Sequence, residues 1–138
     1  MTTKEKIIQA LYTHVAKRSG MDYRNYGNRE SFNGDYRPML RDGATARRML
    51  AYVAVRPSIT AERIIAASRS AFSGRLEIVV KSETVQVSYC AGQYFATEYR
   101  KAVCAVLARC IREWFDDSDI QKSARREFGR SIAKQWFS

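Results

Sequence analysis

Arginine and tyrosine alternate along residues 21–38, a stretch in which glycine and asparagine interrupt any regular periodicity. A guanidinium group binds phosphate and a flat aromatic ring stacks on a base, so this mixture is typical of nucleic-acid surfaces. The same residue types are enriched at the hot spots of protein–protein interfaces. A structural role is the alternative, with the tyrosines folded onto the core and the arginines paired with nearby carboxylates. The candidate binding residues of this long irregular loop are Arg24, Tyr26, Arg29, Tyr36 and Arg37.

Basic residues recur at four-residue steps near the C-terminus, parallel to a stripe of apolar residues. At about 100° per residue this spacing predicts one amphipathic helix, opened by a capping box of Ser118 and Gln121. Such a helix binds phosphates, lies on an anionic membrane or is simply solvated. The apolar stripe is aromatic and core-like, so we favour contact with phosphates or an acidic partner. The basic stripe consists of Lys122, Arg126, Arg130 and Lys134, with Arg125 at its border.

Three more cations complete the candidate residues for binding nucleic acid or another partner. Arg47 and Arg48 belong to a heavily cationic segment, and Arg100 lies in the first turn of the helix predicted over residues 97–115. That first turn could also meet the basic last helix or the loop at 21–38.

The residue patterns of common catalytic and metal sites do not occur in this sequence. His14 is the one histidine, and Cys90, Cys104 and Cys110 form no CxxC pair. The cysteines have apolar neighbours, which indicates reduced thiols packed as small hydrophobic groups in a cytoplasmic protein. We therefore predict a non-enzymatic protein without cofactor or metal. An enzyme that uses the 21–38 loop as an anion pocket is a further hypothesis, and it predicts a deep polar cleft.

Composition narrows the class of partner. The chain has 138 residues, which predicts a single domain over 1–138, and a formal net charge of +10. A basic excess of this size favours an anionic partner, namely nucleic acid, a nucleoprotein complex or an acidic protein surface. No apolar run is long enough to span a bilayer, so we predict no membrane contact.

Hydrophobic periodicity predicts an α+β fold of about five helices and one antiparallel β-hairpin. Helical spacing indicates a first helix capped by Thr2 and Glu5, a second that Pro38 opens, and a third capped by Thr60. Apolar and polar residues then alternate from Arg75 to Tyr89, with a turn at Ser82 and Glu83, which predicts the hairpin. The longest apolar-periodic run, 97–115, follows and is expected to form the core helix. The basic helix comes last.

The order of three helices and a hairpin resembles a winged helix, which suggests a DNA-binding transcriptional regulator as the alternative function. Residues 60–72 would then be the recognition helix and 81–84 the tip of the wing. Only Arg63, Arg69 and Lys81 supply basic side chains there, which is few for reading duplex DNA.

Four segments resemble small bacterial proteins carried on plasmids and other mobile elements: LYTHVAKRSGMDYRNYG, SGRLEIVV, YCAGQYFATEYRKAVCAVLA and REFGRSIAKQWF. The resemblance implies an association with mobile DNA. Such proteins include inhibitors of host nucleic-acid defence, among them anti-CRISPR proteins. A basic inhibitor of this kind would bind an acidic protein surface, a guide RNA or the target duplex.

Overall fold

Six helices and one β-hairpin make up the computed structural model, which describes residues 1–18, 44–70, 76–89, 96–111 and 118–137. The predicted α+β class and the position of the hairpin before the core helix are confirmed. The loop at 21–38 lies outside the described residues. The elements in chain order are α1 (Thr3–Arg18), α4 (Ala44–Ala54), α5 (Ala61–Ser70), β1 (Leu76–Val80), β2 (Val85–Tyr89), α6 (Ala96–Cys110), α7 (Ser118–Phe128) and α8 (Arg130–Phe137).

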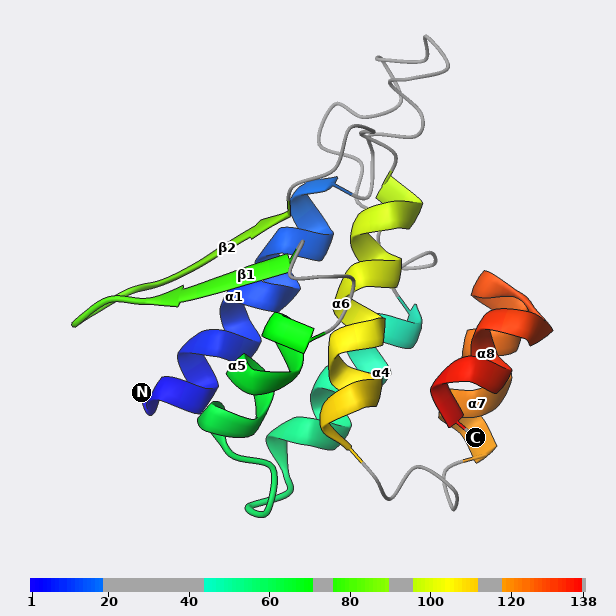
Figure 1. Ribbon diagram of the computed structural model, residues 1–138, viewed down its shortest axis with the longest axis horizontal. Helices are drawn as coiled ribbons and strands as arrows, with labels where there is room; N and C mark the ends of the chain where they lie inside the picture. Colours follow the sequence, from blue (N-terminus) through cyan, green and yellow to red (C-terminus); the bar gives the residue numbers. More distant parts are fainter. Residues whose placement is uncertain (19–43, 71–75, 90–95, 112–117, 138) are drawn as a thin grey trace, which may run out of the picture.

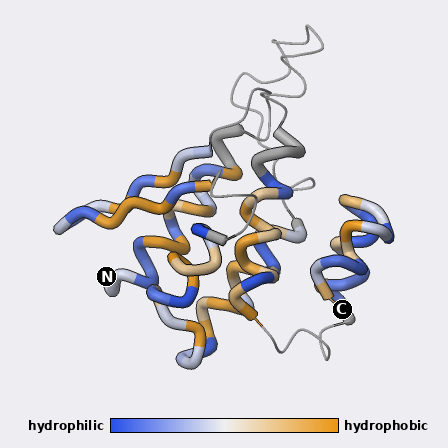
Figure 2. The backbone as a smooth tube through the Cα atoms, viewed as in Figure 1, coloured by the Kyte–Doolittle hydropathy of each residue, from blue (hydrophilic) through white to orange (hydrophobic). Residues whose placement is uncertain are grey.

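Helix α6 is the centre of the fold, as the length of its apolar run predicts. It contacts α1, α4 and α5 (Figure 1), and Val103, Val106 and Leu107 are fully buried. Helical steps of three and four residues bring these side chains to one broad face, and burying that face drives the packing of the other helices. Hydrophobic residues accordingly gather where the helices of this body meet, whereas hydrophobic and hydrophilic residues alternate along α7 and α8 (Figure 2).

Side chains cap two of the helices as their sequences predict. At the start of α1, the Glu5 N–H donates to Thr2 Oγ1 at 3.1 Å, and the Thr2 N–H donates to Glu5 Oε1 at 3.4 Å. Before α5, the Arg63 N–H donates to Thr60 Oγ1 at 3.2 Å. Each cap satisfies an N–H group that has no partner within the helix. Helical spacing also predicts that Tyr12 lies on the apolar face of α1, but this side chain is 39% exposed.

The hairpin packs by one side on the helices. Its strands pair antiparallel from Leu76 opposite Tyr89 to Val80 opposite Val85, and the Lys81 N–H donates to the Thr84 carbonyl at 2.8 Å across the turn. Strand β2 contacts α1, and β1 contacts α5. The tip of the hairpin extends past the helices (Figure 1), and Val80 is 42% exposed there. Two strands are marginal alone, so this packing on helices is what stabilises them.

The C-terminal basic segment forms two helices instead of the predicted single one. Gly129 separates α7 from α8 and adopts a φ of +95°, a conformation that side-chain-bearing residues rarely adopt. Its N–H donates to the Arg125 carbonyl at 3.0 Å, which closes the end of α7. The chain then folds back, and α8 packs against α7 on the side of the molecule away from the hairpin (Figure 1). Among the described residues, no helix is long and apolar enough to cross a membrane.

Candidate anion-binding surface on the C-terminal helices

A buried cluster of polar side chains attaches α7 to the body of the fold. Arg100 Nε on α6 donates to Glu127 Oε1 on α7 at 3.0 Å, and the Thr45 N–H on α4 donates to Glu127 Oε2 at 3.3 Å. The hydroxyls of Thr45 and Ser123 are 2.7 Å apart and share a hydrogen bond. One carboxylate therefore connects three helices. We call Thr45, Arg100, Ser123 and Glu127 the polar cluster.

Burial shifts the pKa values in and around the polar cluster. The side chains of Arg100 and Glu127 are 6% and 13% exposed. Loss of hydration raises the pKa of Glu127 above its usual range, although the hydrogen bonds from Thr45 and the Arg100 charge act in the opposite direction. Burial also raises the pKa of Cys104 well above its ordinary value, and the Glu127 charge adds to this. A buried charge whose partner is removed costs about 3–5 kcal/mol, so the pair fixes where α7 lies.

Small residues let α8 approach α7 closely. Ala124 on α7 and Ala133 on α8 are both buried, and the two helices contact each other. Phe128 and Trp136 pack edge to face beside them, with ring centroids 5.3 Å apart and an angle of 68° between the planes. Contacts of α8 with α6 complete the packing of the helix pair. The relative position of α7 and α8 is thus set by apolar packing on the inner side.

Residues of both helices line a groove of about 490 Å³, which we call the basic groove. Gln121 and Arg125 line it from α7, and Arg130 and Lys134 line it from α8. Its apolar lining comes from Phe137, which also packs partly against the core, and from the buried Ala133. None of the described residues that line the groove is acidic, and no salt bridge joins Arg125 or Arg130 to a described carboxylate. A concave surface whose described lining has three cations and no carboxylate is suited to an anion.

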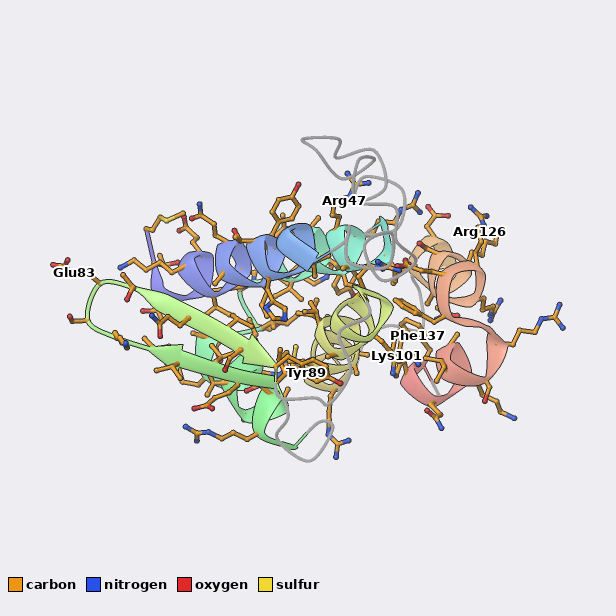
Figure 3. The ribbon with its side chains drawn as sticks, turned by 90° about the horizontal axis from the view of Figure 1, so that it is seen from above. Arg47, Glu83, Tyr89, Lys101, Arg126 and Phe137 are labelled. Carbon is orange, nitrogen blue, oxygen red and sulfur yellow. The ribbon has the colours of Figure 1, made fainter. Side chains whose placement is uncertain are left out.

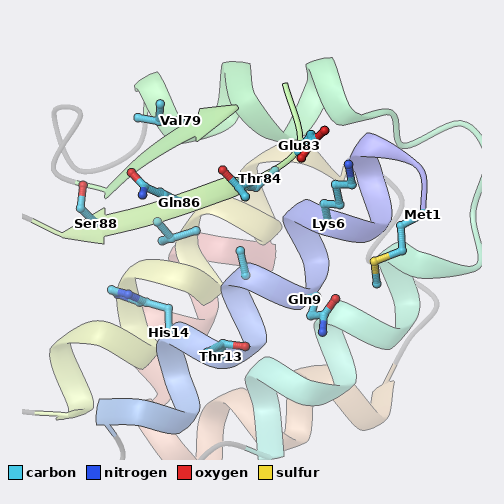
Figure 4. A pocket seen from close by; sticks show the side chains of 13 residues that line it. Met1, Lys6, Gln9, Thr13, His14, Val79, Glu83, Thr84, Gln86 and Ser88 are labelled. Atoms are coloured by element: carbon cyan, nitrogen blue, oxygen red, sulfur yellow. The ribbon is translucent and has the colours of Figure 1, made fainter. Parts of the chain in front are cut away.

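A second hollow of about 660 Å³ lies between α1 and the hairpin (Figure 4). His14, buried at 5% exposure, lies toward one end of this cleft, and Lys6 and Glu83 lie toward the other. Its remaining polar side chains are neutral amides and hydroxyls. No group of three or more possible metal ligands occurs among the described residues. Cys104 and Cys110 are buried in the core and do not line this cleft.

Comparisons with protein-family models, curated proteins and solved structures found no match. The resemblance to proteins of mobile elements therefore stays a prediction. The geometry of the two helices and their charges carries the functional argument.

The predicted stripe of cations on the last helix is divided by the turn at Gly129. Lys122 and Arg126 are exposed on α7 outside the basic groove, and Arg126 points away from the body (Figure 3). Arg130 lines the groove together with Lys134. Sequence reasoning placed Arg125 only at the border of the stripe, whereas the structure places it in the groove.

Gln121 was missed as a binding candidate, although its spacing offered a signal. It lies four residues before Arg125, which puts the two side chains on one face of α7. The return of α8 along that face could not be read from this spacing, because it depends on the chain reversing at Gly129.

The structure corrects the prediction for Arg100. This residue is 5% exposed and bonded to Glu127, so it holds helices together instead of meeting an outside partner. It does meet the last helical segment, as the position of the first turn of α6 suggested. On α4, Arg48 is exposed and Arg47 is half-buried, away from the basic groove. The five candidates of the 21–38 loop (Arg24, Tyr26, Arg29, Tyr36 and Arg37) lie outside the described residues.

The winged-helix alternative finds little support in the exposed face of α5. Glu62 and Arg69 are exposed there, so the charges on this face nearly cancel. Arg63 is half-buried, and its Nη1 donates to the Ser58 carbonyl at 3.1 Å. A helix that enters a phosphate-lined groove of duplex DNA needs a more cationic face.

Proposed function

We propose that this chain is a non-enzymatic binding protein that acts on nucleic acid, alone or within a nucleoprotein complex. The contact surface is the exposed side of α7 and α8. The observation that supports this proposal best is the basic groove, in which cations from two helices surround a concave surface without a carboxylate among its described lining residues.

The distribution of charge on these helices adds to the argument. Residues 118–137 contain five basic and two acidic side chains, and one of the acidic ones, Glu127, is turned inward to Arg100. Asp119 is then the single exposed carboxylate of the two helices. The two helices thus carry a net charge of +3, which favours the approach of a polyanion to this side.

Preorganisation supports the same proposal. The polar cluster and the packing of Phe128 on Trp136 hold both helices against the body before any partner arrives. Binding then requires little ordering of backbone, which lowers the entropic cost of association.

Salt dependence tests the proposal. Neutralising Z phosphates gives a slope of log K against log salt of about −0.9Z for duplex DNA and about −0.7Z for single strands. We expect labelled oligonucleotides to bind the wild type in fluorescence anisotropy, and the double variant K122A/R126A to reduce the steepness of the slope by about 1.4–1.8.

The double variant R69A/K81A is the matched control, because it also removes two exposed cations but from α5 and the hairpin tip. Its slope should equal that of the wild type. If R69A/K81A flattens the slope while K122A/R126A does not, the winged-helix regulator is the better interpretation. Absence of binding to any DNA or RNA at low salt would overturn direct binding of nucleic acid.

A further inference from the structure

The basic groove differs in shape from the exposed face of α7 that carries Lys122 and Arg126, which we call the crest. It runs along the crease between α7 and α8, with Arg125 on one wall and Arg130 and Lys134 on the other. Its volume of about 490 Å³ lies within the range of about 300–1,000 Å³ that is usual for sites of small molecules. A crease of this size admits one extended strand or one nucleotide. A duplex is far too wide to enter it and would rest on the crest, where Lys122 and Arg126 are exposed.

The groove also differs from the crest in its chemistry. The exposed part of Phe137, whose side chain also packs against the core, gives it an apolar lining, with the buried Ala133 beneath. A duplex turns its charged backbone outward and keeps its bases stacked and paired, so it offers nothing apolar to this lining. An unpaired strand offers phosphates and base faces together, and aromatic side chains commonly stack on such faces. The Gln121 amide both donates and accepts hydrogen bonds, as the edge of an unpaired base requires.

We infer that the basic groove binds a single strand of RNA or DNA in preference to a duplex. The phosphates lie between Arg125 and the pair Arg130 and Lys134, and a base contacts Phe137. This inference rests on the proposed function and narrows it, because the proposed function holds for any form of nucleic acid.

Two glutamine substitutions separate the groove from general electrostatics. Q121E places a carboxylate in the groove without changing the size of the side chain. Q135E makes the same change at an exposed position of α8 that does not line the groove. Both variants change the net charge by the same amount, so a difference between them reports on the groove alone.

The experiment measures the anisotropy of one labelled oligonucleotide of mixed sequence, as a single strand and as a blunt duplex, at a fixed low salt concentration. We expect the wild type to bind the single strand about tenfold more tightly than the duplex. A tenfold difference in affinity corresponds to the free energy of about one base-stacking contact, which the duplex cannot make. Q121E should weaken single-strand binding about tenfold, and Q135E should change it by less than about twofold. Thermal unfolding of each variant verifies that the fold is retained.

A further substitution, F137L, keeps an apolar side chain and removes the flat ring. We expect it to reduce the preference for the single strand while the salt dependence stays that of the wild type. Equal affinity for single strand and duplex, or equal effects of Q121E and Q135E, would overturn the inference and leave the proposed function standing. Failure to bind either form would instead overturn the proposed function itself.

Discussion

Glu127 is the residue on which the position of the candidate surface depends. Its carboxylate accepts hydrogen bonds from the Arg100 guanidinium and from the Thr45 N–H, and so links α7 to both α6 and α4. A buried pair of this kind contributes little net stability compared with a well-packed apolar pair, but it specifies one arrangement because any other leaves a charge without its partner. We therefore attribute the position of α7 on α4 and α6 to the pairing of Glu127 with Arg100 and Thr45.

The raised pKa of Glu127 gives this residue a measurable dependence of stability on pH. The folded protein holds the Glu127 proton more tightly than the unfolded chain, in which the carboxyl titrates near pH 4.3. Its contribution to stability is therefore full below about pH 4.3 and is lost as the pH rises through the folded pKa. We expect the free energy of unfolding of the wild type, minus that of E127Q, to decrease as the pH is raised across this window.

Urea unfolding at a series of pH values measures this difference. E127Q leaves an amide facing two donors, and the resulting loss of stability is constant with pH, so it does not affect the slope. A difference that grows as the pH rises would show that the pKa of Glu127 is lowered by its partners, contrary to the direction that burial imposes.

The turn between α7 and α8 decides whether the basic groove exists. Gly129 has a φ of +95°, and a Cβ placed there would meet no atom within 4 Å. The cost of G129A is therefore conformational and not steric, and we expect it to lower the free energy of unfolding by about 1–3 kcal/mol. S131A is the control, because it introduces the same side chain at an exposed position of α8. Equal urea midpoints for G129A and S131A would contradict the role of the turn.

Local sequence patterns sufficed for most elements and failed at this turn. The Thr2–Glu5 cap, the pairing of β1 with β2 and the apolar face of α6 each depend on neighbours in sequence, and each is confirmed. A lone glycine inside a helical pattern costs only about 1 kcal/mol, so the pattern through Gly129 predicted one helix. What reverses the chain is the burial of Ala133 and the packing of Trp136, which are tertiary contacts without a local signature.

The same distinction between local patterns and tertiary contacts explains which residues of the candidate site could be predicted. The sequence identified the cations of the C-terminal segment, because their helical spacing is local. It did not show that Arg100 pairs with Glu127, 27 residues away, and so counted Arg100 among the binding residues. Charge alone does not separate a buried cation from a surface one. That separation requires the partner, which only the fold supplies.

At the scale of the whole molecule, the hairpin and the basic helix pair lie on opposite sides of the helical body (Figure 1). The screening length is about 10 Å at 0.1 M salt, so charges on the hairpin contribute little to the field at the far side. The field at the helix pair therefore comes mainly from charges that lie close to it. A partner held through α7 and α8 leaves the hairpin and its cleft accessible.

Affinity capture from a cell lysate, with the full chain as bait, tests whether polyanions bind through α7 and α8. We expect the wild type to retain host nucleic acid at low salt and to release it as the salt is raised, because each phosphate contact carries its own salt dependence. K122A/R126A should retain less, whereas R69A/K81A, with the same loss of charge, should retain as much as the wild type. Nuclease treatment before capture should remove the retained material and any protein bridged by it. A protein partner that resists nuclease and depends on Lys122 and Arg126 would instead identify an acidic protein surface as the ligand of the helix pair.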